Sequence, residues 1–305
     1  MKWEKLGRIF EPTCQFNWMQ KYGILPTPFH ISSENKIRVY FGTSAEDKMC
    51  KVTFMDLSDE DPTQILTQPT EIVLDLGEPG MFDDSGINPS SVILVNDDLL
   101  LYYVGYERSY RRPYKLFPGL ARMQAGKNLF TRVKKVPLID RSEEYPYSLA
   151  APFVIYEENI YKMWLWLAKE WIIVNQKEYL KASIGYAVSE NGIDWKIVKQ
   201  NCIDTNDNEF SIGRPWVLSE NGLYKMFYSV RHFEKLYRIG LAISEDGINW
   251  TRKDNEAGID VSESGWDSEM ICYPAVIKCK GETYMFYNGN GNGINGFGVA
   301  RLIEN

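Results

Sequence analysis

The sequence predicts an all-β fold, a five-bladed β-propeller with four antiparallel strands in each blade. Three observations predict it. A proline-led hairpin pattern recurs at spacings of 61, 63, 63 and 59 residues, at Pro28, Pro89, Pro152, Pro215 and Pro274. Aromatic residues, which favour strands, make up 14% of the 305 residues. The repeats fill the chain without helical segments, which predicts a single domain over residues 1–305.

Each repeat opens with a β-hairpin. A proline precedes a short apolar strand, a polar turn with Asn, Asp or Gly follows, and an alternating strand then ends in aromatic residues. This order is typical of two antiparallel strands joined by a tight turn. The hairpins are expected at residues 27–43, 88–105, 151–167, 213–230 and 273–289.

A third and a fourth strand are expected to complete each repeat. The third ends in Gly-x-Ala at 119–121, 185–187, 240–242 and 298–300. Two similar phrases follow it, VSENGIDW at 188–195 and ISEDGINW at 243–250, and their Asn-Gly or Asp-Gly suits a tight turn into a strand that carries Trp195 or Trp250. We interpret the phrase as scaffold, a turn with a tryptophan packed between sheets, and not as a binding site.

The N-terminal strand is expected to complete the last blade. The segment WEKLGRIFEP resembles the predicted fourth strand WKIVKQNCID at 195–204, and the sequence stops where the last repeat still lacks its fourth strand. Pairing of the two ends would close the ring and remove an exposed sheet edge.

Composition argues against several classes of function. The net charge is −7 and no basic patch is large enough for a nucleic-acid backbone. No apolar run approaches the roughly 20 residues of a membrane helix. The charged start MKWEKLGRIF and five scattered cysteines without a CxxC indicate a cytoplasmic protein with free thiols. With two histidines, a zinc site is not expected, and we expect no metal and no cofactor.

Carboxylates precede several of the hairpin prolines, where the chain should approach the central axis. Asp83 and Glu209 lie six residues before a proline, and Asp84 and Glu269 lie five before one. Clustered carboxylates raise one another's proton affinity, so that one can act as an acid and another as a base in glycosidic bond cleavage. We predict Asp84, Glu209 and Glu269 as the catalytic group. The alternative is that these acids cap turns or pair with arginines.

Residues next to the prolines are predicted to bind the substrate. Those directly before them mix polar, cationic and aromatic side chains around one axis: Thr27, Asn88, Ala151, Arg214 and Tyr273. Arg214 and Arg231 offer bidentate donors for a carboxylate or a phosphate, or else neutralise neighbouring acids. The predicted substrate-binding set is Asp83, Arg214, Arg231, Asp267, Tyr273 and Asn288.

Two long loops between second and third strands share this face, and such loops often shape a site. The loop at 105–119, GYERSYRRPYKLFPG, is basic and aromatic, and the loop at 168–183 is AKEWIIVNQKEYLKAS. Candidate platforms for stacking on a sugar ring, each explained more readily by packing, are Trp18, Trp166, Trp171 and Trp266.

With these motifs in place, the whole chain resembles the five-bladed β-propeller superfamily of carbohydrate-active enzymes. That superfamily includes glycoside hydrolase families 43, 32 and 117 and the mannoside phosphorylases of family 130. The chain is most similar to glycosidase-like proteins associated with bacterial polysaccharide pathways, in the segments FDDSGINP (82–89), SVR (229–231), WDSEMICYP (266–274) and YNGNG (287–291). Family 43 enzymes place an Asp before the first proline and a Glu in an EGP motif. This chain has Thr27 and then GRP or CYP, so the resemblance does not extend to that catalytic set.

Together the residues and the resemblance predict a carbohydrate-active enzyme, a glycoside hydrolase that acts in a central acidic funnel by carboxylate acid–base chemistry. A glycoside phosphorylase or glycosyl transferase on the same scaffold is one alternative. A non-catalytic propeller that binds a glycan or a sugar nucleotide is another. The expected partner is a carbohydrate or glycoconjugate, and the arginines favour one with an anionic group.

Overall fold

The computed structural model describes residues 1–112, 114–124, 126–220 and 222–304. The regular structure of this part of the chain is almost entirely β-sheet. Its helical segments are short, namely the 3-10 turns Ser32–Glu34 and Asp254–Glu256 and the single turn α1 (Asn290–Gly293). Among the described helices, none has the length and apolar character that crossing a membrane requires.

Three sheets contain four antiparallel strands each. The first consists of β2 (Lys21–Ile31), β3 (Lys36–Ser44), β4 (Lys51–Ser58) and β5 (Ile65–Thr67). The second consists of β6 (Ile87–Val95), β7 (Asp98–Arg108), β8 (Tyr114–Met123) and β9 (Thr131–Arg132). The third combines both ends of the chain and consists of β18 (Cys272–Cys279), β19 (Glu282–Asn288), β20 (Phe297–Glu304) and β1 (Lys2–Phe10).

The fourth sheet has eight strands and divides into two units of four. One unit consists of β10 (Leu149–Glu157), β11 (Ile160–Val174), β12 (Lys177–Ser189) and β13 (Lys196–Ile203). The other consists of β14 (Glu209–Glu220), β15 (Leu223–His232), β16 (Arg238–Ser244) and β17 (Thr251–Arg252). A single parallel bridge, Ala182 to Ser211, joins them, whereas the strands within each unit pair antiparallel.

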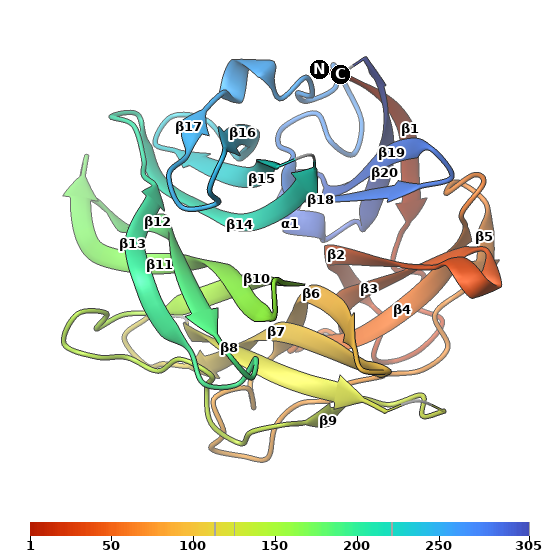
Figure 1. The fold of residues 1–305 in the computed structure, drawn as a ribbon, viewed down its shortest axis with the longest axis horizontal. Coiled ribbons are helices and arrows are strands. Elements are labelled where there is room, and N and C mark those ends of the chain that lie inside the picture. The colour runs from red at the N-terminus through yellow and green to blue at the C-terminus, as the bar shows by residue number, and fades with distance from the viewer. Residues whose placement is uncertain (113, 125, 221, 305) are drawn as a thin grey trace.

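The units are arranged around a common centre, with their first strands innermost and their fourth strands outermost (Figure 1). The first strands contact one another in a closed circuit, in the order β2, β6, β10, β14, β18 and back to β2. Each proline that defined a sequence repeat lies in one of these inner strands. The inner strands therefore bring five sequence-distant segments to one place.

The N-terminal strand joins the last sheet, which confirms the predicted pairing of the two ends. β1 pairs antiparallel with β20, from Lys2 opposite Glu304 to Phe10 opposite Phe297. The Trp3 indole is buried and donates a hydrogen bond of 2.9 Å to the carbonyl oxygen of Ala257. The two termini consequently lie side by side (Figure 1).

The two copies of the repeated phrase fold into the same turn. In the first copy the Asn191 Oδ1 atom accepts hydrogen bonds of 2.9 Å from the backbone N–H groups two and three residues later. In the second copy Asp246 Oδ1 accepts the corresponding bonds, of 2.8 and 2.7 Å. Asn and Asp are interchangeable here because each presents one oxygen to the same backbone turn.

Each of these turns also holds a neighbouring unit. The carbonyl oxygen of Gly192 accepts a hydrogen bond of 3.1 Å from the Tyr102 hydroxyl of β7, and that of Gly247 accepts one of 2.7 Å from the Trp164 indole of β11. Tyr102 and Trp164 are completely buried. The phrase is therefore part of the scaffold, as its sequence predicted.

Candidate functional site

Four of the inner strands share one backbone irregularity. The strand register shifts at an X-Pro pair, and residue X has a positive φ, at Leu25 (55°), Ala151 (49°), Arg214 (53°) and Tyr273 (56°). Residues with a Cβ atom rarely adopt this conformation, which costs about 1–3 kcal/mol. All four residues line one cavity. The repeated bulge is thus the local feature that brings the residue before the proline to the centre.

Two of the predicted pre-proline positions need correction. In β2 the bulge lies at Leu25–Pro26, and Thr27 is buried with its hydroxyl donating a 2.9 Å hydrogen bond to the Leu25 carbonyl oxygen. In β6 Asn88 pairs regularly with Val104 and is not a bulge residue. Prolines at both 26 and 28 fit the same alternating pattern, so the sequence does not distinguish them.

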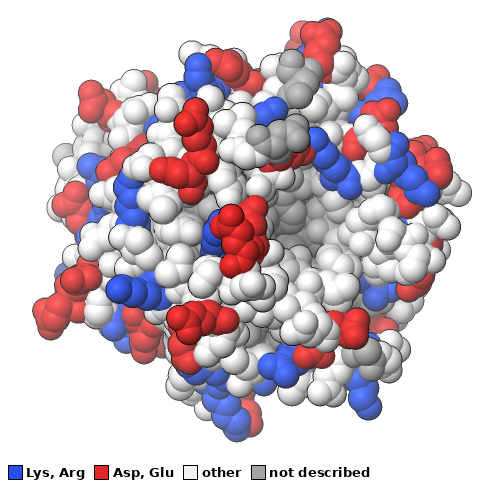
Figure 2. Space-filling view, in the orientation of Figure 1, with Lys and Arg blue, Asp and Glu red and all other residues white. Residues whose placement is uncertain are grey.

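The cavity has a volume of about 420 Å³. Its lining comes from the inner strands β2, β10, β14 and β18, from β15, and from the hairpins β7–β8 and β11–β12. The molecular surface is hollowed near the centre of the face in Figure 2. A concave site of this size with aromatic walls and a few polar groups is typical of a small-ligand pocket.

Arg214 lies at the bottom of the pocket and is 2% exposed. Its guanidinium donates to the carbonyl oxygens of Ser90 and Pro26 and, at 3.1 Å, to the Thr27 hydroxyl. All these acceptors are neutral, and the buried Nε atom has no hydrogen-bond partner. Burial lowers the pKa of Arg214 to about 9. The side chain is therefore a buried cation that no described carboxylate neutralises.

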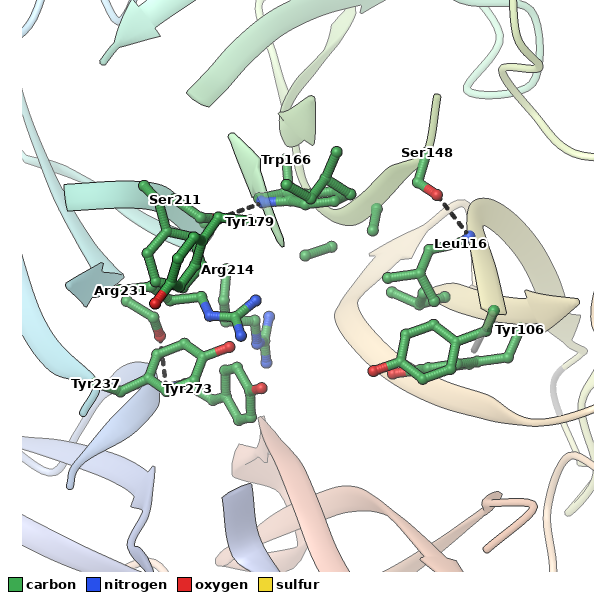
Figure 3. A pocket seen from close by; sticks show the side chains of 18 of the residues that line it. Tyr106, Leu116, Ser148, Trp166, Tyr179, Ser211, Arg214, Arg231, Tyr237 and Tyr273 are labelled. Atoms are coloured by element: carbon green, nitrogen blue, oxygen red, sulfur yellow. Dashed lines mark hydrogen bonds between the residues drawn. The ribbon is translucent and has the colours of Figure 1, made fainter. Parts of the chain in front are cut away.

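Arg231 projects from β15 into the same pocket (Figure 3). Its guanidinium lies over the Phe210 ring at 4.7 Å and over the Tyr237 ring at 5.1 Å from the ring centres. These faces position the group without neutralising it. Within the described residues, Arg231 forms no ion pair with an acid at 4.0 Å or less.

Aromatic side chains form the walls around the two arginines (Figure 3). Trp166 is fixed by a 2.9 Å hydrogen bond from its indole to the Ser211 hydroxyl, and Tyr237 packs edge-on against Tyr273. Burial raises the pKa of Tyr106 and of Tyr273 well above the usual value for tyrosine. These hydroxyls therefore stay protonated at neutral pH and can donate hydrogen bonds to a ligand.

Two hairpins meet at the mouth of the pocket. Arg112, beyond β7, forms an ion pair with Glu178 of β12, and its guanidinium lies 4.2 Å from the ring centre of Trp171 on β11. Among the described residues that line the pocket, Glu178 is the single carboxylate. The charge of the lining is therefore predominantly positive, which differs from the predicted acidic funnel.

The predicted acids Asp83, Glu209 and Asp267 do not line this pocket. Each is buried against a basic residue of the outermost strand in its own unit. The pairs are Asp83 with Arg132 of β9 at 2.7 Å, Glu209 with Arg252 of β17 at 2.8 Å, and Asp267 with Lys5 of β1 at 2.7 Å. The recurring carboxylate before the proline thus belongs to a repeated structural ion pair.

The other predicted site residues lie at the surface, in the scaffold or in the pocket. Asp84 accepts hydrogen bonds within its own turn, from Gly80 N–H at 2.8 Å and from the Ser85 hydroxyl at 2.6 Å. Glu269 is exposed and lies outside the pocket lining. Asn288 is buried and bonds to the backbone of β2, including Leu25 N–H at 2.9 Å.

The structure therefore does not bring the predicted catalytic group of Asp84, Glu209 and Glu269 into the pocket. It does place Arg214, Arg231 and Tyr273 there. Pocket residues that the sequence did not single out include Tyr106, Glu178, Tyr179 and Tyr237. Their signal was present in part, because Tyr106, Glu178 and Tyr179 fall in the segments 105–119 and 168–183, which the sequence predicted as long loops. The structure shows these segments mostly as strand, because β7 and β8, and likewise β11 and β12, extend into them as hairpins. No three His, Cys, Asp or Glu side chains of the described residues are placed to hold a metal ion.

Comparisons with known proteins find relatives by sequence and many solved structures with a similar fold. No protein-family model matches the chain. Over the full length of both proteins, the sequence is 35% identical to the uncharacterized proteins Rv1502 and MT1551 from two strains of Mycobacterium tuberculosis. These relatives are similar to the chain from end to end.

Solved structures share the fold at low identity. A glycoside hydrolase matches with a TM-score of 0.77 and 16% identity, covering 98% of this chain and 91% of that one. A structure of a BT0996 RGII complex matches at 0.78 and 17%, covering 99% and 92%. A thermostable family-43 glycoside hydrolase matches at 0.68 and 16%, covering 93% and 91%. At these identities the likeness shows the fold alone. The chain thus has a glycoside hydrolase-like fold and belongs to the same family as the uncharacterized protein Rv1502 of Mycobacterium tuberculosis.

Proposed function

We propose that the chain is a single-domain, five-bladed β-propeller over residues 1–305 whose central pocket binds a carbohydrate. Five units of four strands and the closed circuit of inner strands support the architecture. The observation that carries the functional proposal is the pocket of about 420 Å³ with aromatic walls at the point where the inner strands meet. Flat aromatic faces with nearby hydrogen-bond donors suit the apolar faces and hydroxyl groups of a sugar.

Glycoside hydrolysis is the second candidate function, and the fold shared with glycoside hydrolases favours it. The usual mechanism needs two carboxyl groups that flank the scissile bond. Among the described lining residues the pocket offers Glu178 alone, and Arg112 holds it in an ion pair. Binding therefore ranks before hydrolysis. Phosphorolysis or transfer on the same scaffold would show itself by dependence on phosphate or on an acceptor sugar.

The cellular setting is also proposed. We propose a cytoplasmic protein of polysaccharide metabolism. Support for the compartment comes from the five cysteines, all of them free thiols, four of which are buried. Support for the pathway comes from the resemblance of FDDSGINP and WDSEMICYP to glycosidase-like proteins of bacterial polysaccharide pathways.

A glycan array tests the carbohydrate proposal, with Trp166→Ala as the pocket variant and Tyr156→Ala as its control. Tyr156 is an exposed aromatic residue outside the pocket lining. We expect the wild-type protein and Tyr156→Ala to bind the same set of glycans, and Trp166→Ala to bind them about tenfold more weakly. Absence of glycan binding, or equal binding by all three proteins, would contradict the proposal.

Incubation of each bound glycan with the protein, with and without inorganic phosphate, then separates binding from turnover. Release of a sugar without phosphate establishes hydrolysis, and release of a sugar phosphate establishes phosphorolysis. Saturable binding with an unchanged glycan after several days supports the binding function.

A further inference from the structure

We propose that the ligand of this pocket is an acidic sugar, one that carries a carboxylate or a phosphoryl group, and that it enters with this anionic group directed at Arg231 and Arg214. The proposal rests on the proposed carbohydrate function and specifies its substrate class. In the proposed binding mode, the charged end of the ligand lies deepest and any further sugars extend toward the mouth of the pocket.

The charge of the pocket bottom supports an anion. Arg214 is buried among neutral acceptors, and the Arg231 guanidinium packs against two aromatic rings. Burying a cation without a counter-ion is costly, and Arg214 is such a cation. Arg231 is partly exposed and adds a second positive charge to the same cavity. Together they favour a ligand that supplies negative charge. Burial lowers the pKa of Arg214, as expected for a buried cation that has no carboxylate beside it.

The two arginines have different tasks. Three donor hydrogens of Arg214 are already engaged by β2 and β6, so its contribution to a ligand is mainly its charge. Arg231 is partly exposed and its guanidinium has no described acid partner, so its planar fork is free for two parallel hydrogen bonds to an anion. Arg231 is therefore the residue that binds the anionic group of the ligand directly.

Arg214 also explains why the ligand must enter from one end. Its side chain starts on β14 and reaches the backbone of Pro26 on β2 and of Ser90 on β6. It therefore spans the space between three inner strands and forms a floor under the pocket. A cavity of about 420 Å³ is also near the lower end of the range for ligand sites, about 300–1,000 Å³. A pocket this small, with a floor at one end, suits a single acidic sugar or the end of a glycan, and not the middle of one.

The pocket mouth is consistent with this direction. Glu178 lies there, is exposed, and pairs with Arg112. The negative charge of the lining is thus confined to the rim, whereas the two unpaired guanidinium groups lie inside. A ligand with one charged end would therefore be oriented with that end inward.

The first test uses pairs of glycans that differ only in charge, on one array: uronic-acid-terminated, phosphorylated and the corresponding neutral sugars. The variants are Arg231→Gln, which removes the charge, and Arg231→Lys, which keeps the charge without the fork. Arg111→Gln is the matched control, because Arg111 is an exposed residue of the neighbouring hairpin tip that does not line the pocket. Melting temperatures of all variants establish that they are folded.

We expect the wild-type protein to prefer an acidic member of a pair, and Arg231→Gln to weaken that binding by about 10- to 100-fold. Arg231→Lys should fall between them, and Arg111→Gln should bind like the wild type at about 0.15 M salt, where the Debye length is about 8 Å. Whether uronic-acid or phosphorylated glycans are retained identifies the source of the anionic group. Preference for neutral sugars, or equal binding by Arg231→Gln, overturns the acidic-sugar proposal and leaves the carbohydrate function standing.

The second test needs no sugar. Inorganic phosphate and acetate are compared with chloride at equal ionic strength by thermal denaturation. A rise in melting temperature for the wild type and for Arg111→Gln, but not for Arg231→Gln, supports the anion site. If the array also shows no bound glycan, the carbohydrate function and the sugar part of the inference both fail, and the anion site at Arg231 stands. No rise with either anion, together with no preference for acidic glycans, overturns the inference.

Discussion

Arg252, on the outermost strand β17, binds Glu209, at the start of the inner strand β14, through two hydrogen bonds of 2.8 Å each. Bidentate contacts of this kind are among the strongest polar contacts in proteins. The pair connects the two edges of one four-stranded unit, and similar acid–base pairs occupy the corresponding place in two other units. These contacts indicate a structural role for Glu209, and its catalytic role stays a prediction.

Glu209→Gln is expected to destabilise the protein. The substitution leaves the Arg252 guanidinium with Asp254 as its remaining acid partner, at 2.5 Å. Breaking a buried ion pair on one side costs about 3–5 kcal/mol, and the retained partner reduces this to about 2–3 kcal/mol in the free energy of unfolding. Urea denaturation of the wild type and the variant measures the difference.

Glu4→Gln is the control for this measurement. Glu4 pairs with Arg301 at 2.7 Å on the surface, where both side chains are more than 40% exposed. Exposed pairs contribute less than about 1 kcal/mol, so Glu4→Gln should denature close to the wild type. Equal stability of the wild type and Glu209→Gln would show that Glu209 is not structural and would restore it as a candidate acid or base.

The same ion pair predicts a pH dependence of stability. Burial alone would raise the pKa of Glu209, but the hydrogen bonds from Arg252 and from Asn206 N–H outweigh burial, so the pKa lies below its ordinary value of 4.5. Because the pKa is lower in the folded than in the unfolded state, the carboxylate stabilises the fold fully above pH 4.5. This contribution is lost as the pH falls through the folded-state value.

The free energy of unfolding should therefore fall more steeply below pH 4.5 for the wild type than for Glu209→Gln. Urea midpoints of both proteins, measured from neutral pH downward, test this. A constant difference between the two proteins at every pH would contradict the assigned ionic contact.

The sequence was sufficient to predict the repeats, because each proline marks an inner strand and each Gly-x-Ala marks a third strand. It also predicted that β1 would pair with β20, from the similarity of two strand sequences. The residue before the proline in β2 was predicted as Thr27 and is Leu25 in the structure, because Pro26 and Pro28 lie two residues apart and a two-residue shift leaves the strand alternation unchanged.

The site was harder to predict for a physical reason. The distance from a proline gives the position of a carboxylate in the sequence. Its role depends on which residues it contacts in the folded protein. Asp83 meets Arg132, 49 residues later, and no local pattern encodes that contact. Arg214 and Arg231 were recognised as possible anion ligands, but only the structure shows that they have no described acid partner and that the acids are paired elsewhere.

Deletion of residues 1–10 should destabilise the whole protein. The deletion removes β1, its pairing with β20, the buried Trp3 side chain and the Lys5 partner of Asp267. We expect the melting temperature to fall by more than about 10 °C. A variant with Lys2→Ala and Glu4→Ala keeps the strand and should melt within about 2 °C of the wild type. An unchanged melting temperature after the deletion would refute the closing role of β1.

The turn in ISEDGINW can be tested by two substitutions of one residue. Asp246→Ala removes the oxygen that accepts hydrogen bonds from two backbone N–H groups, and should lower the free energy of unfolding by about 1 kcal/mol. Asp246→Asn should destabilise less than Asp246→Ala, because Asn191 accepts the same two backbone hydrogen bonds in the other copy of the turn. It still loses the Oδ2 atom that accepts a 2.7 Å hydrogen bond from the Asn249 side chain. Urea denaturation of both variants measures this. Equal effects of Ala and Asn would show that the shared oxygen is not what stabilises the turn.

Strain at the pocket can be tested at Ala151, whose φ of 49° is unfavourable for a residue with a Cβ atom. Ala151→Gly removes that strain but makes the unfolded chain more flexible, so the two effects oppose each other. We expect the net change to range from zero to a stabilisation of about 1 kcal/mol. Ala187→Gly, at a buried position of β12 that pairs with Met163 of β11 and has no positive φ, gains no relief and should destabilise by about 0.5–1 kcal/mol. Chemical denaturation of both variants compares them. Equal losses in the free energy of unfolding would mean that the left-handed bulge does not persist in solution. The direction in which the inner strands present Arg214 and Tyr273 to the pocket would then not persist either.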